Sequence, residues 1–105
     1  PGYIQQVRNW VLANDATLYA QCRQVLATGV TELINPTPPI IHPTLVVTCE
    51  NDSGSTPAMS HGIAREILSS QTLIVPQLQH MGLVEQPELF VQPLVTFLKQ
   101  TLRSA

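Results

Sequence analysis

Charge is scarce in this chain. Only 11% of its 105 residues are Asp, Glu, Lys or Arg, whereas about a quarter is usual for a soluble protein. Lys and Arg together number five, and the net charge is −2. These numbers exclude a basic patch for nucleic acid and a polybasic membrane anchor. A surface this poor in charge also suggests that part of it faces other protein.

Long apolar runs and frequent cysteines are also missing. No uninterrupted stretch approaches the ~18 apolar residues that a transmembrane helix needs, and no signal peptide is recognisable. The chain begins with Pro1 rather than Met, and we expect a fragment or processed product of a longer protein. The two cysteines, Cys22 and Cys49, stand in unrelated apolar contexts. We therefore expect free thiols in a reducing, cytoplasmic compartment rather than a disulfide.

The first third of the chain has the periodicity of helices. Apolar residues recur at helical spacing over residues 3–13 and again over 18–26. Four prolines then fall between Ile34 and Pro43, a density that excludes both a helix and a central strand. We place a boundary in this connector, with a helical segment over residues 1–35 and a second region over 36–105.

The second region alternates strands and helices. Thr44–Cys49 is a run without polar alternation, as expected of a strand covered on both faces. Thr56 and Pro57 suit the start of a helix, Thr72–Val75 reads as a second strand, and Pro87 begins a final helix. This order predicts a parallel sheet with right-handed crossovers. Because two parallel strands hardly stand alone, we expect part of a larger α/β fold.

Apolar spacing also predicts which helix faces are buried. In the helix after Pro57, Met59, Ile63 and Ile67 should lie on one face. Pro93 interrupts the final helix, which predicts a kink or two short helices. The buried stripe of that helix should consist of Leu89, Phe90, Leu94, Phe97 and Leu98.

An acid and a base follow the two strands directly. Asp52 comes just after the first strand and His80 just after the second. Because the carboxyl ends of parallel strands meet at one edge of a sheet, we expect these side chains to approach each other; together they would be two members of a hydrolytic triad. The alternatives are a turn role for Asp52, whose side chain can bond its own backbone, and an ordinary loop histidine for His80. Glu50 is predicted to be a surface or loop charge.

The nucleophile of such a triad has no convincing candidate here. Ser60 lies in Ala58–Gly62, a loosened form of the G-x-S-x-G elbow, but the elbow needs a strand running straight into it. Ser60 is predicted to be a solvated helix serine instead. Cys22 and Cys49 have neither an elbow nor an adjacent basic group. The histidines and cysteines lack metal-ligand spacing, and we expect neither a metal nor another cofactor.

Parts of the chain resemble a known family, and the likeness extends over Thr44–Leu98. Leu45–Asp52 is similar to the acid-bearing strand and turn of the α/β-hydrolases, as in small esterases and enol-lactonases. His80–Phe90 is similar to their histidine loop and last helix, in which a His, a Glu, a Pro and an aromatic residue recur at these distances. The helical stretch Asp15–Thr28 resembles the cap inserted before the acid strand. Cys49 departs from the family, which usually has Gly there.

The resemblance implies a fold and an activity. The fold would be the C-terminal part of an α/β-hydrolase, with two parallel strands, flanking helices and preceding cap-like helices. In that family the triad order is Ser, Asp, His, so the nucleophile would lie upstream of residue 1, with Asp52 as the acid and His80 as the base. The intact parent would hydrolyse an ester, a lactone or a related carbonyl substrate, and this chain alone would be inactive. The alternative is a non-catalytic binding or scaffolding module derived from the same fold.

The expected partners follow from the same interpretation. The intact parent would bind a small-molecule ester or lactone, and we expect no nucleic acid and no membrane partner. An open strand edge and uncovered helix faces invite association. We therefore expect a homo-oligomer, or association with the missing N-terminal part.

Overall fold

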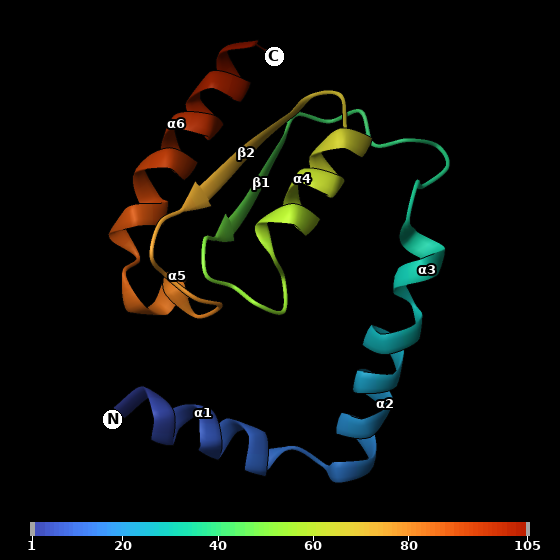
Figure 1. The fold of residues 1–105 in the computed structure, drawn as a ribbon, viewed down its shortest axis with the longest axis vertical. Coiled ribbons are helices and arrows are strands. Elements are labelled where there is room, and N and C mark those ends of the chain that lie inside the picture. Colours follow the sequence, from blue (N-terminus) through green and yellow to red (C-terminus); the bar gives the residue numbers. More distant parts are fainter. Residues whose placement is uncertain (1, 105) are drawn as a thin grey trace. The chain divides into compact units, whose positions relative to one another are not determined.

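The computed structural model describes residues 2–104, and side chains through residue 103. It divides into two compact units, and the boundary in the sequence lies between Pro36 and Thr37. The first unit is helical, and the second combines helices with a two-stranded parallel sheet (Figure 1). The described part of the chain is therefore a mixed α/β structure.

The first unit contains three helices. These are α1 (Gly2–Ala13), α2 (Ala16–Thr28) and the short α3 (Val30–Leu33). The carboxylate of Asp15 starts α2 by accepting the N–H of Leu18 at 3.0 Å, which satisfies an otherwise unpaired backbone donor. None of the described residues of α1, α2 or α3 is buried. Within this unit, the apolar side chains at helical spacing therefore remain accessible to solvent.

The second unit is built from two strands and three helices. In chain order these are β1 (Thr44–Cys49), α4 (Pro57–Glu66), β2 (Ser70–Val75), α5 (Gly82–Glu85) and α6 (Glu88–Ser104). The two strands are parallel, in a register that runs from Thr44 opposite Ser70 to Cys49 opposite Val75. The prediction of two parallel strands is thereby confirmed. The second strand begins two residues earlier than predicted, and α5 was not predicted.

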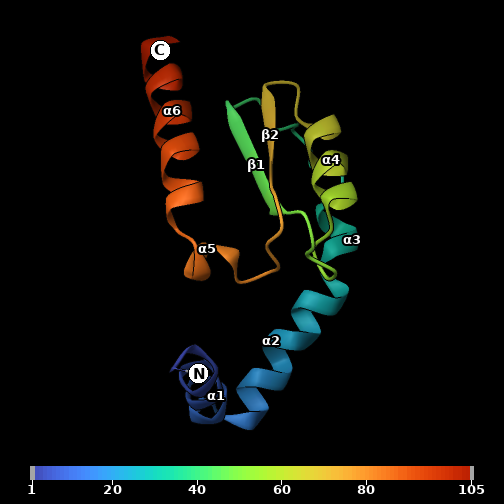
Figure 2. The same cartoon turned by 60° about the vertical axis from the view of Figure 1, so that its left-hand side comes forward.

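Helices α4 and α6 lie on opposite faces of the sheet (Figure 2). On the α4 side, the Thr48 hydroxyl donates to the carbonyl oxygen of Ser55, which precedes α4, at 2.9 Å. On the other side, Leu45 and Val47 line an apolar groove together with α6 residues. Within the described chain β1 pairs with β2 alone, so the other edge of β1 is open.

The core lies beneath the carboxyl ends of the strands. Cys49, Val75 and Leu78 form a buried cluster, against which Leu73 and Phe90 pack. Cys49 ends β1 and Val75 ends β2. The two loops that leave the sheet at this edge therefore start from the best-packed part of the unit.

The apolar residues expected to share one face of α4 are only partly buried. Ser60 of α4 and Ile67, which directly follows the helix, are buried, whereas Met59 and Ile63 are 57% and 50% exposed. The prediction that Ser60 is solvated is therefore wrong. Ser60 and Ala64 are four residues apart, on one face of the helix, and both are less exposed than Met59 and Ile63.

Helix α6 also departs from the prediction. It is one helix with Pro93 inside it, so of the two expected alternatives, a kink or two short helices, the second is wrong. Proline removes one backbone donor, and here the ladder continues past that loss. Phe90 and Phe97 are half-buried, while the other predicted stripe residues, Leu89, Leu94 and Leu98, are 39–48% exposed. Two strands are too narrow to cover the whole apolar face.

Among the described residues, no helix combines the length and apolar character needed to cross a bilayer.

Candidate active site

Asp52 is held in a tight turn at the end of β1. Its Oδ1 accepts the backbone N–H of Gly54 at 3.1 Å and that of Ser55 at 2.9 Å. The turn is closed by the N–H of Asp52 itself, which donates to the carbonyl oxygen of Cys49 at 3.2 Å. The side chain is buried, with 7% of its surface exposed. The alternative role considered for Asp52, bonding its own backbone, is therefore present in the structure.

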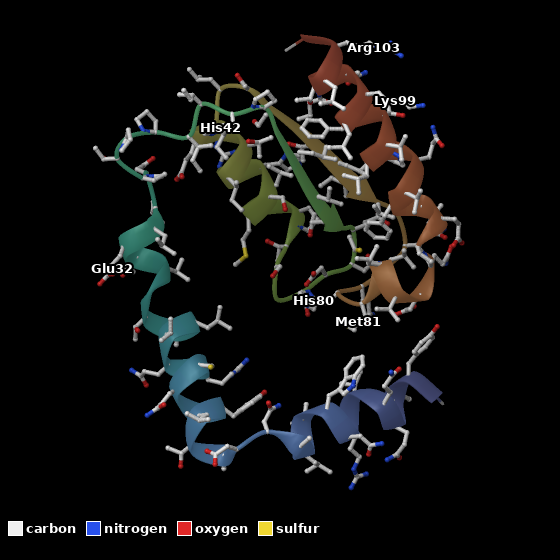
Figure 3. The ribbon with its side chains drawn as sticks, turned by 180° about the vertical axis from the view of Figure 1, so that it is seen from behind. Glu32, His42, His80, Met81, Lys99 and Arg103 are labelled. Atoms are coloured by element: carbon white, nitrogen blue, oxygen red, sulfur yellow. The ribbon has the colours of Figure 1, made fainter. Side chains whose placement is uncertain are left out.

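The same carboxylate also contacts His80. Nδ1 of His80 lies 2.7 Å from Oδ2 of Asp52, across 28 positions of sequence. The labelled His80 stands at the carboxyl end of the strands, beside the loop that leads from β1 to α4 (Figure 3). The expected approach of these two side chains is confirmed. Each oxygen of Asp52 thus has its own task, Oδ1 in the turn and Oδ2 at the imidazole.

These contacts keep Asp52 ionised. The N–H of Ser55 is the largest cause that lowers the pKa of the Asp52 carboxyl, followed by the hydrogen bond with His80. Burial opposes both by disfavouring the charged form, and the N–H of Gly54 adds a smaller lowering effect. The net result is a pKa below the ordinary aspartate value. At neutral pH, His80 therefore faces a carboxylate.

The carboxylate fixes which imidazole nitrogen can act as a base. Because Nδ1 faces Oδ2 of Asp52, it is the nitrogen that carries the proton in the neutral ring. The lone pair then belongs to Nε2. The His80 side chain is 72% exposed, so this nitrogen can be reached from outside the unit. The open cleft around the pair is lined by Asn51, Asp52, Ser53, Gly54, Gln79 and His80.

Backbone hydrogen bonds tie the Asp52 turn to the His80 loop. The N–H of Glu50 donates to Val75 at 2.8 Å, and that of Asn51 donates to Leu78 at 2.9 Å. In addition, the Glu50 carboxylate accepts the N–H of Gln77 at 3.0 Å. Glu50 is exposed, as predicted for a surface charge, but its bond to a backbone amide 27 positions away was not predicted.

No described residue offers a nucleophile elbow. Ser60 lies within α4, where its N–H donates to the carbonyl oxygen of Thr56 at 3.2 Å. β1 ends at Cys49 and α4 begins at Pro57, so no strand runs directly into Ser60, as an elbow requires. Burial, and then the charge of Asp52, raise the pKa of the Cys49 thiol, which disfavours the reactive thiolate. Cys22 is exposed on α2, in the other unit.

The remaining histidines lie apart from the Asp52–His80 pair in the fold. His42 precedes β1 at the amino end of the sheet, whereas His80 is at the carboxyl end (Figure 3). His61 is exposed on α4. Within the described residues, no group of three or more His, Cys, Asp or Glu side chains could hold a metal ion.

Comparison of the chain with protein-family models, with curated proteins and with solved structures gave no match. The candidate site therefore rests on the geometry of its own residues. Its defining contact is the 2.7 Å approach of His80 to Asp52.

Proposed function

We propose that this chain supplies the acid and the base of a serine-type α/β-hydrolase that acts on an ester, a lactone or a related carbonyl substrate. The single observation that carries the proposal is the contact between His80 Nδ1 and Asp52 Oδ2 at 2.7 Å. Both residues follow parallel strands at the same edge of a sheet. A buried acid that orients an exposed imidazole is the arrangement that general-base catalysis requires.

In the proposed fold, residues 36–105 are the C-terminal part of the hydrolase core and residues 1–35 are helices of its cap. The nucleophile is a serine on an elbow upstream of residue 1. The open edge of β1 supports a larger sheet, because an uncharged strand such as Thr44–Cys49 is rarely left at an edge. The apolar groove between β1 and α6 also supports a larger fold, because an open apolar surface of this kind is usually covered by other protein. Six apolar side chains line the groove: Leu45, Val47, Leu73, Leu83, Phe90 and Leu94.

In the proposed reaction, Nε2 of His80 accepts the proton of the serine hydroxyl as the serine oxygen attacks the substrate carbonyl. Asp52 stabilises the resulting imidazolium through Nδ1, without taking its proton. His80 then gives the proton to the leaving alkoxide, and an acyl-enzyme remains. Water repeats the sequence: His80 takes its proton, the oxygen attacks the acyl carbonyl, and the proton returns to the serine.

A fluorophosphonate probe tests this proposal in the intact parent protein, because it labels only a serine that a base has activated. We expect labelling of a serine upstream of residue 1, and its loss in His80→Ala and in Asp52→Asn. His61→Ala is the matched control, since His61 is exposed on α4 and has no role in the proposed site. Absence of labelling in the unmodified parent would contradict the proposal and favour the non-catalytic module.

A further inference from the structure

The Glu50 side chain makes a contact that the proposed reaction does not use. Its Oε1 accepts the backbone N–H of Gln77 at 3.0 Å. Glu50 immediately follows β1, and Gln77 lies in the loop between β2 and His80. The bond therefore joins the segment that carries the acid to the segment that carries the base.

Gln77 is the point at which the second loop changes direction. Its φ is 68°, in the left-handed region that is uncommon for residues other than glycine. A backbone conformation of this kind persists when its surroundings hold it. The amide of Gln77 is held by the Glu50 carboxylate, and charge-assisted hydrogen bonds are stronger than neutral ones.

The neighbouring contacts show what this bond adds. Val75 and Leu78 on either side of Gln77 accept backbone bonds from Glu50 and Asn51, and both are buried in the core cluster. The buried residues Val75 and Leu78 thus hold the chain before and after Gln77. The Glu50 side chain holds Gln77 itself. His80 lies two residues after Leu78. The backbone path from Val75 to Leu78 therefore determines the position of the imidazole.

We propose that Glu50 is a positioning residue. Its carboxylate holds Gln77 in the left-handed backbone conformation and thereby keeps His80 beside Asp52. The role depends on the reach of the acceptor oxygen, and the charge adds strength to the bond. This inference rests on the proposed function, because it assigns Glu50 to the same pair. It concerns the loop rather than the chemistry, since Glu50 contacts neither the substrate nor the reacting atoms.

Three substitutions separate reach from charge. Glu50→Gln keeps an oxygen at the same distance but loses the charge, while Glu50→Asp keeps the charge and shortens the side chain by one methylene. Glu50→Ala loses both. We expect Glu50→Gln to keep the His80 tautomer of the unmodified chain, with a weaker bond to Gln77, and Glu50→Asp and Glu50→Ala to release the loop. Should Glu50→Ala fail to fold, the comparison of Asp with Gln still decides the proposal.

The tautomer of His80 is the readout that a merely structural role would not move. In ¹⁵N NMR spectra of the 105-residue chain at alkaline pH, we expect the neutral ring to carry its proton on Nδ1. Glu50→Asp and Glu50→Ala should shift the proton toward Nε2, because His80 no longer faces Asp52. Exchange of the Gln77 amide hydrogen should also accelerate more than about tenfold in these two variants, as the loss of a bond to a charged acceptor implies.

Two negative results would have different meanings. An unmodified chain in which Nδ1 carries no proton would overturn the proposed function, because the Asp52–His80 pair would not form. An unmodified chain with the expected tautomer, retained in folded Glu50→Asp and Glu50→Ala, would overturn only the positioning role of Glu50.

Discussion

The sulfur of Cys49 occupies space that a side chain on Gly82 would need. A Cβ atom built on Gly82 would stand 2.7 Å from Sγ of Cys49 and 2.9 Å from Cβ of Leu78. Real Cβ atoms essentially never approach other heavy atoms this closely. The sulfur of Cys49 at the end of β1 is therefore accommodated by the absence of a side chain on Gly82, two residues after His80.

Gly82→Ala should destabilise the chain by about 1–3 kcal/mol, the usual cost of overpacking a core. Urea unfolding followed by circular dichroism measures the change. In the double variant Cys49→Ala/Gly82→Ala the added methyl takes the place of the lost sulfur, and we expect a favourable coupling of about 0.5–3 kcal/mol. Additive effects of the two substitutions would show that Cys49 and Gly82 do not compete for this space.

Asp52 should make stability depend on pH in the acidic range. Its pKa is lower in the folded state than the ordinary aspartate value, so the unfolded chain binds its proton first as the pH falls. The stabilisation is fully present above the ordinary pKa and is lost as the pH falls toward the lowered one. We expect the advantage of the unmodified chain over Asp52→Asn in urea unfolding to shrink across that interval. A constant difference between the two would contradict the lowered pKa.

His80→Ala should abolish ester or lactone hydrolysis by the intact parent and leave its fold largely unchanged. Loss of a triad member typically costs on the order of 10⁴ to 10⁶ in rate. Steady-state turnover measures the loss, and His42→Ala, at the other end of the sheet, is the control that should retain activity. If the His80 variant kept even about a tenth of the turnover, His80 would not be the base.

The 105-residue chain alone should be catalytically inactive and should self-associate. The open edge of β1 and the accessible apolar side chains of the helices are surfaces of the kind through which proteins associate. Light scattering measures association. Val47→Lys places a charge on β1, and Val7→Lys places one on α1; whichever reduces the measured mass identifies the surface used. A stable monomer would rule out association, and hydrolysis by this chain would show that Ser60 or a cysteine had been dismissed wrongly.

Local rules account for what the sequence could predict. β1 has the predicted bounds because Thr44–Cys49 is rich in residues that favour strands, but Val47 is 39% exposed, so the prediction that both faces are covered is only partly met. Thr56 begins α4 because its hydroxyl accepts the N–H of Met59 at 3.2 Å, as a capping hydroxyl should. The approach of His80 to Asp52 followed from parallel pairing and from the position of each residue after its strand.

The errors arose where packing between elements decides the outcome. Apolar spacing placed Met59, Ile63 and Ile67 on one face of α4, but of these three only Ile67 is buried, and the small side chain of Ser60 is buried instead. Whether a helix buries its longest or its smallest side chains depends on the shape of the opposing surface. The sequence of the helix alone does not determine that shape. The bond from Glu50 to Gln77 was missed for a similar reason, because nothing local to either residue specifies it.

The divided use of the Asp52 carboxylate has a consequence for how the histidine is ordered. The N–H groups of Gly54 and Ser55 hold Oδ1 in the turn. The turn alone therefore restricts rotation of the Asp52 side chain, independently of the contact between Oδ2 and the imidazole. Restraining a free aspartate would cost conformational entropy. Here that cost belongs to the folding of the turn, and the contact with His80 incurs little more. The alignment of His80 with Asp52 at this edge of the sheet is thus a by-product of loop formation.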